Sequence, residues 1–340
     1  MTQGIASHPP VPATSGTADP GRAERTDRIV GLVQRQGAAA VLGVVVIAGA
    51  LAFPEFRSYA NAATILVTAA PPMLIALGMT FVIITGGIDL SVGSLYVLGG
   101  VVAAYASQWG LPAAFAVPLL LCGAIGVLNG ALVAYARMAP FIVTLAALLG
   151  ARGLMRAITD EGSTTYLVRN DAFRAFGNGS FLGLGYPVWL AAALVLVGAL
   201  VLARTRFGNA VFAVGGSADA ASLMGVAVRR TRVSVYVISA LLAGLAGAVN
   251  TAKLGSGVTV LGTGMELDAI AAVVIGGTLL TGGAGSVGGT VAGVLLLAVV
   301  QNLINQVGTL NSNWQQVVSG VFLAAVVVAQ TYLNRLRRVT

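Results

Sequence analysis

A single carboxylate, Asp89, lies between two long apolar stretches, within the glycine-containing segment Gly78–Ser94. A charged group among membrane-spanning residues is costly unless it is paired, hydrated or protonated, so it is a candidate functional residue. Asp89 could act in a solute pathway or gate, and its neighbours there would be Thr85, Gly86, Gly87 and Ser91. The alternative is that Asp89 caps the following helix by accepting hydrogen bonds from free backbone amides.

A second informative segment is Gly208–Gly225, which includes Gly215, Gly216, Ala220 and Ala221. Ser217 is a suitable N-cap with Asp219 in the first turn, so the sequence predicts a short helix ending near Gly225. Leu223 and Met224 would give this helix an apolar face. Because isolated helices of this length are marginal in water, the helix needs a partner. The residues alone leave two partners open, a docking protein or the lipid surface.

A third segment, Glu266–Thr290, contains seven glycines between positions 276 and 289, among them Gly276, Gly277, Gly282 and Gly283. Glycines allow helices to pack closely, and they also allow an unwound segment that lines a pathway. Asn129 is a polar residue inside another apolar run. We expect its amide to bond to a neighbouring helix, and contact with solute hydroxyls is the alternative.

Several kinds of chemistry lack their residues in this sequence. It has no Gly-x-x-x-x-Gly-Lys-Ser/Thr motif, so we expect no ATP hydrolysis by this chain itself. His8 is the only histidine, and we expect neither a metal site nor a cofactor. An intramembrane enzyme is disfavoured because no nucleophile has a nearby base.

The elements that must position these residues are membrane spans. The composition is 57% hydrophobic and only 9% charged, whereas charged residues make up about a quarter of a globular chain. Runs of about 18 or more apolar residues can cross the hydrocarbon core as helices. The sequence therefore predicts an all-α, polytopic transmembrane bundle of about ten spans, at residues 37–53, 63–87, 91–107, 111–136, 140–157, 186–203, 233–250, 268–281, 287–306 and 315–333. The eighth is short and is a candidate for a broken or re-entrant helix.

The distribution of basic residues predicts the orientation. With both termini in the cytoplasm, thirteen of the nineteen basic residues are cytoplasmic, as the positive-inside rule requires. We expect a flexible cytoplasmic tail over residues 1–35, a transmembrane domain over 36–334 with a cytoplasmic connector at 204–232, and a basic tail over 335–340. There is no long basic stripe with interleaved aromatic residues, so nucleic acid is not an expected partner.

Together these segments resemble the permease subunits of ribose-type sugar ABC importers, a branched-chain amino acid and ribose-like group of binding-protein-dependent membrane components. The resemblance covers the chain from about Ser58 to Tyr332. It is carried by Gly78–Ser94, Gly126–Gly130, Pro140–Leu145 with Arg152 and Gly153, Glu266–Gly293 and Gly208–Gly225.

The resemblance implies a multi-pass protein of the bacterial inner membrane that carries a sugar-like solute. It implies a second permease chain, identical or related, two cytoplasmic ATP-binding subunits, and an extracytoplasmic solute-binding protein. It also implies that Gly208–Gly225 holds the helix that engages the ATP-binding subunit. The rival hypothesis is a proton-coupled secondary transporter that uses Asp89. The sequence does not specify which sugar or polyol is carried.

Overall fold

The computed structural model describes residues 37–307 and a few isolated positions between 314 and 328. Within these residues the regular secondary structure is helical apart from one two-stranded antiparallel hairpin and one isolated antiparallel bridge between Leu167 and Ser256. The elements, in chain order, are a helix at Gly37–Ala52, η1 (Pro54–Arg57), α2 (Tyr59–Ile84), α3 (Val92–Ala106), η2 (Ser107–Trp109), α4 (Leu111–Ala134), α5 (Pro140–Ile158), α6 (Asp171–Asn178), β1 (Ser180–Phe181), β2 (Leu184–Gly185), α7 (Tyr186–Arg204), α8 (Arg206–Gly216), α9 (Ala218–Leu223), α10 (Val228–Leu254), α11 (Met265–Ile275) and α12 (Val287–Val307).

Six of these helices are long and apolar enough to cross a membrane, namely α2, α4, α5, α7, α10 and α12. Three other predicted spans are also helical but shorter, at Gly37–Ala52, α3 and α11. With 11 residues, α11 extends only about 16 Å, so the short eighth element is confirmed as short. The tenth predicted span and both predicted tails lie largely or wholly outside the described residues.

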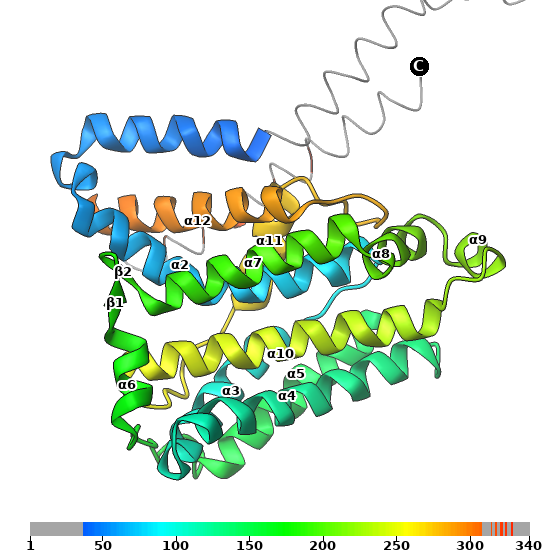
Figure 1. Cartoon of the computed structure of the whole chain (residues 1–340), viewed down its shortest axis with the longest axis horizontal. Helices are drawn as coiled ribbons and strands as arrows, with labels where there is room; N and C mark the ends of the chain where they lie inside the picture. Colours follow the sequence, from blue (N-terminus) through cyan, green and yellow to red (C-terminus); the bar gives the residue numbers. More distant parts are fainter. Residues whose placement is uncertain are drawn as a thin grey trace, which may run out of the picture.

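The long helices run roughly side by side, with α6 and the hairpin at one end of the bundle and α8 and α9 at the other (Figure 1). The segments Thr159–Gly185 and Arg204–Arg232 therefore lie at opposite ends. In α2, 83% of the most apolar window is buried, against 22% in α5 and α7. Helices α5 and α7 thus present most of their apolar surface outward, as lipid-facing helices do.

The centre of the bundle is α10, which packs against α2, α3 and α4. Glycines make these contacts close. A methyl group added at Gly78 would lie 2.8 Å from the Ser239 Cα atom, and one added at Gly126 would lie 2.6 Å from the Ala240 Cβ atom. Small residues that let backbones approach are typical of helix contacts in membranes, where water supplies no hydrophobic driving force.

The predicted connector at 204–232 contains α8, which the sequence analysis did not predict, in addition to the short helix α9. Helix α10 begins at Val228, five residues before the predicted span at 233–250. The missed signal is Thr205, whose hydroxyl accepts a hydrogen bond from the Gly208 amide at 3.1 Å and so caps α8. Hydropathy locates where a helix enters the membrane and not where the helix begins.

Candidate functional site

The three segments selected from the sequence meet at one end of the bundle. Gly283, in the turn after α11, donates its amide proton to the carbonyl of Ile84 at the end of α2, at 2.9 Å. A methyl group added at Gly215 in α8 would collide with the same carbonyl oxygen. One added at Gly282 would lie 2.8 Å from the Gly86 amide nitrogen. The turn after α2, helix α8 and the glycine-rich turn are therefore in backbone contact.

Helix α9 has the local geometry that the sequence predicts. The Ser217 hydroxyl accepts a hydrogen bond from the Ala220 amide at 3.2 Å, and Asp219 lies in the first turn. Gly225 follows with φ of 81°, a conformation that side chains rarely adopt. Leu223 and Met224 are 90% and 85% exposed. The helix is therefore formed and capped, and its apolar face is uncovered.

The coupling residues taken from the sequence divide into two groups. Gly208 and Gly215 belong to α8 and pack against the body of the protein, Gly208 against the carbonyl groups of Val201 and Leu202. Gly216, Ser217, Asp219, Ala220, Leu223, Met224 and Gly225 are exposed, whereas Ala221 is buried. Only the second group, apart from Ala221, forms an accessible surface.

Asp89 is fully buried in the connection between α2 and α3. One carboxylate oxygen accepts hydrogen bonds from the Ser91 amide at 3.0 Å and the Ser91 hydroxyl at 2.5 Å, and the other accepts one from the Ser239 hydroxyl at 2.8 Å. The Asn129 amide donates to the Ser91 hydroxyl at 3.2 Å. This network joins the segment before α3 to α4 and α10. The N-cap residue of α3 is Ser91, and α3 has no side-chain cap, so the bonds of Asp89 hold the turn that precedes the helix.

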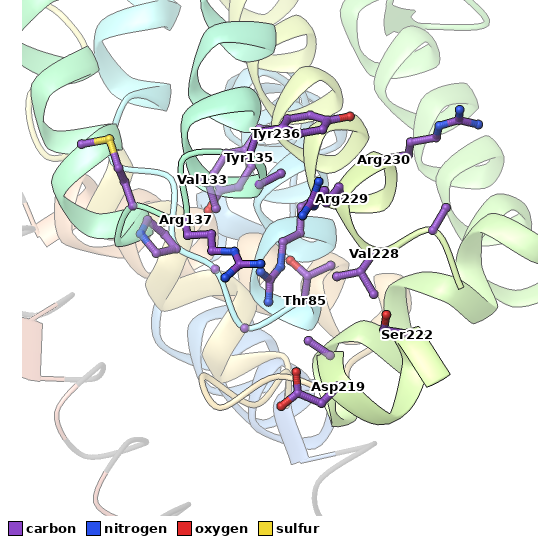
Figure 2. Close-up of a pocket in the computed structure, with 18 residues that line it drawn as sticks. Thr85, Val133, Tyr135, Arg137, Asp219, Ser222, Val228, Arg229, Arg230 and Tyr236 are labelled. Atoms are coloured by element: carbon purple, nitrogen blue, oxygen red, sulfur yellow. The ribbon is translucent and has the colours of Figure 1, made fainter. Parts of the chain in front are cut away.

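A cavity of about 820 Å³ opens beside this network at the same end of the molecule. Thr85, Gly86 and Gly87 form part of its wall, and Asp219 and Ser222 of α9 form another part (Figure 2). Asp89, Ser91 and Asn129 do not line the cavity. The cavity is therefore bordered by both the predicted pathway turn and the predicted coupling helix.

The glycines after α11 serve two purposes. Gly276 and Gly289 are in contact, so closely that neither position has room for a side chain, which agrees with tight packing of α11 on α12. Gly277, Gly282 and Gly283 have positive φ values between 79° and 89° and lie in an unwound segment. Close packing therefore accounts for Gly276 and Gly289, and the unwound backbone accounts for Gly277, Gly282 and Gly283, while a place for these glycines in the pathway stays a prediction.

Sequence reasoning missed two residues that complete the site. Tyr236 of α10 is buried, its hydroxyl lies 3.5 Å from the Ile88 carbonyl oxygen, and it lines the cavity. Ser239, three residues further along α10, bonds to Asp89. Both are polar groups within a predicted span, and this is the signal that led us to Asn129. Among the described residues, no group of three His, Cys, Asp or Glu side chains could hold a metal ion.

This architecture defines a multi-pass membrane protein with a helical element exposed beyond the bundle at one end. Residues 61–327 match the family model for the permease component of branched-chain amino acid transport systems. The chain belongs to this family of ABC transporter permeases, a transport component that functions with an ATPase and a binding protein.

Curated relatives agree with this assignment. The chain is 40% identical over 301 residues to the ribose import permease protein RbsC of Bacillus subtilis, covering 88% of this chain and 93% of the relative. It is 40% identical over 291 residues to the inner membrane ABC transporter permease protein YjfF of Escherichia coli, covering 83% and 87%. It is 35% identical over 311 residues to the fructose import permease protein FruG of Bifidobacterium longum, covering 88% and 91%. No solved structure matches.

Proposed function

We propose that this chain is the inner-membrane permease of an ABC importer for a small sugar. Relatives that cover most of the chain are named as ribose and fructose import permeases, and this supports the choice of cargo. We further propose about ten spans with both termini in the cytoplasm, two permease chains with the pathway between them, two ATP-binding subunits, and a solute-binding protein at the opposite face. The concentration of basic residues at 204–232 supports the orientation.

The observation that carries the mechanism is the backbone contact between Gly215 and Ile84. Helix α9 is the proposed docking element for the ATP-binding subunit, and α8 links it to the turn after α2. Because packed backbones resist compression, a displacement of α9 would be transmitted through α8 to Thr85–Gly87 and to the glycine-rich turn. ATP binding would thereby switch the pathway from inward to outward opening.

The experiment is sugar uptake by proteoliposomes that contain this chain, its ATP-binding subunit and its binding protein. Uptake should persist after a protonophore collapses the proton gradient, and it should stop when enclosed ATP is depleted. Gradient-driven uptake in the absence of ATP would reject the proposal and favour the rival transporter based on Asp89.

An Asp89→Asn variant separates these two functions further. Asparagine retains an oxygen that can accept the bond from the Ser91 amide or from Ser239 but has no proton to exchange with solvent at neutral pH. An importer driven by ATP should retain ATP-dependent uptake in this variant, whereas a proton-coupled carrier should lose its response to the gradient. A network that fails to form would appear as a lower melting temperature, measured on the same preparation.

Gly225→Asp tests the proposed docking role of α9. A methyl group at Gly225 meets nothing within 4 Å, and Asp tolerates positive φ better than most residues, so the protein should still insert and fold. The new charge lies beside the apolar residues Leu223 and Met224. We expect ATP hydrolysis to be uncoupled from uptake in the assembled transporter, and full coupled activity would remove this role.

A further inference from the structure

The cavity between α9 and α10 is strongly cationic. Its lining contains four arginines, at positions 137, 229, 230 and 232, and one carboxylate, Asp219. Across the described ranges no ion pair neutralises these guanidinium groups. The positive-inside rule explains why arginines lie at this end of the molecule, but Arg204 and Arg206 of α7 and α8 lie outside the cavity. The rule therefore does not explain why four arginines line one cavity.

The arginines come from two separate elements. Arg137 lies in the turn between α4 and α5, and Arg229 lies at the start of α10 with its guanidinium carbon 5.6 Å from the centre of the Tyr135 ring. Figure 2 shows Arg137 and Arg229 on the same side of the cavity, away from Asp219. Arg137 has φ of 55°, in the left-handed region, which is uncommon for a residue with a side chain.

The position of Arg229, Arg230 and Arg232 also opposes the dipole of α10. All three lie within the first five residues of the helix, where the positive end of the dipole disfavours cations. The first backbone amides of α10 point toward the same end, and Ala227 at the N-cap position supplies no side-chain acceptor. An anion in the cavity would balance the guanidinium groups and the helix terminus together.

We propose that this cavity binds a soluble phosphate monoester, of the kind formed when an imported sugar is phosphorylated in the cytoplasm. Arginine presents a planar set of donors that matches phosphate oxygens in pairs. A phosphate monoester carries a charge of about −1.5 to −2 at neutral pH, whereas the free sugar carries none. The cavity volume of about 820 Å³ lies within the range of about 300–1,000 Å³ that is usual for small-molecule sites.

The different charges on the two sides of the cavity determine the orientation of the bound ester. The phosphate would lie against Arg137 and Arg229, because Asp219 on the α9 side repels it. The sugar hydroxyls would then face Ser222 and Thr85, which both line the cavity. A bound ester would contact α9 and the turn after α2 at once. If the proposed function holds, on which this step rests, the ester would restrict α9 and slow uptake when phosphorylated product accumulates.

The binding experiment uses the full-length permease in neutral detergent and does not depend on transport. Ribose 5-phosphate, inorganic phosphate and ribose are titrated separately by calorimetry at low salt. We expect saturable binding of ribose 5-phosphate, weaker binding of inorganic phosphate and none of ribose. Arg137→Gln and Arg229→Gln should each weaken binding about tenfold, since each removes a charge-assisted contact. Arg204→Gln is the matched control, because it removes a cation outside the cavity.

Several outcomes would overturn the site. These are the absence of saturable binding of either phosphate compound, equal loss in Arg204→Gln and Arg229→Gln, and equal binding of ribose. Binding of ribose 5-phosphate that is displaced by phosphatidylglycerol vesicles would keep the phosphate site but identify a lipid headgroup as its source. Loss of binding on addition of the ATP-binding subunit alone would assign the cavity to that protein and reject a small ligand.

The regulatory step is tested in the proteoliposomes described above, with ribose 5-phosphate enclosed. Slower ATP-driven uptake in the unaltered transporter, relieved in Arg137→Gln, would support it. Unchanged uptake would overturn the regulation while leaving the proposed function intact. Failure of ATP to drive any uptake would reject the proposed function, and the calorimetric result would still decide the binding site.

Discussion

Two glycines at the ends of one segment, Gly215 in α8 and Gly225 after α9, differ in the constraint that requires them. At Gly215 the backbone conformation is helical, and a side chain is excluded because the Ile84 carbonyl oxygen occupies the space. At Gly225 the space is empty, and a side chain is disfavoured because φ is 81°. The segment is therefore fixed to the bundle at one end and exposed at the other, as an element that transmits a force requires.

The strongest test of this comparison is Gly215→Ala against Gly216→Ala. The first places a methyl group on the Ile84 carbonyl oxygen, and the second places one where nothing lies within 4 Å. We expect Gly215→Ala to reduce stability by about 1–3 kcal/mol. It should also abolish uptake, because the methyl group forces α8 away from the Ile84 carbonyl and breaks the contact that transmits movement. Gly216→Ala should be neutral or slightly stabilising. Thermal unfolding and uptake of both variants measure the effect, and equal behaviour would break the comparison.

An intermediate effect is expected at the exposed end, from Leu223→Asp. Leu223 is 90% exposed, so the substitution should leave the melting temperature of the permease unchanged. It should weaken the affinity for the ATP-binding subunit about tenfold, because binding would bury an unpaired carboxylate where an apolar side chain stood. Val260→Asp is the control, since Val260 is 80% exposed and follows α10 near the opposite end. Equal losses of affinity in the two variants would contradict docking at α9.

The smallest effect is expected from Ser217→Ala. This substitution removes the bond from the Ala220 amide and should destabilise α9 locally by about 1 kcal/mol. Hydrogen exchange should accelerate at residues 218–223 and remain unchanged in α10. Ser217→Asp should restore protection, because Asp is also a good N-cap residue. Equal exchange rates at residues 218–223 in the unaltered protein and both variants would show that the Ser217 cap does not stabilise α9.

Local signals in the sequence predicted the local structure well. Ser217 marked the start of α9 and the apolar runs marked the long helices, whereas the predicted span at 268–281 ran past the end of α11 at Ile275. Each of these features depends on residues within a few positions of one another. The family was likewise predictable, because its segments are contiguous in the sequence.

The long-range contacts could not be predicted in the same way. No local pattern pairs Gly215 with Ile84, or Asp89 with Ser239, which is 150 positions away. The arginines of the cavity could be assigned only to one side of the membrane. The positive-inside rule depends on the number of basic residues in each connector and does not show which of them lie close together in space. The assignment of individual residues to the pathway and to ATPase coupling stays a prediction.

The glycine contacts along α10 have a consequence for how the protein can move. Helices whose backbones touch have little freedom to slide, since there are no flexible side chains between them to rearrange. The contacts of α10 with α2, α3 and α4 should hold these four helices fixed relative to one another. Rearrangement during a transport cycle is then left to helices at the periphery, such as α5 and α7, and to the half-length α11.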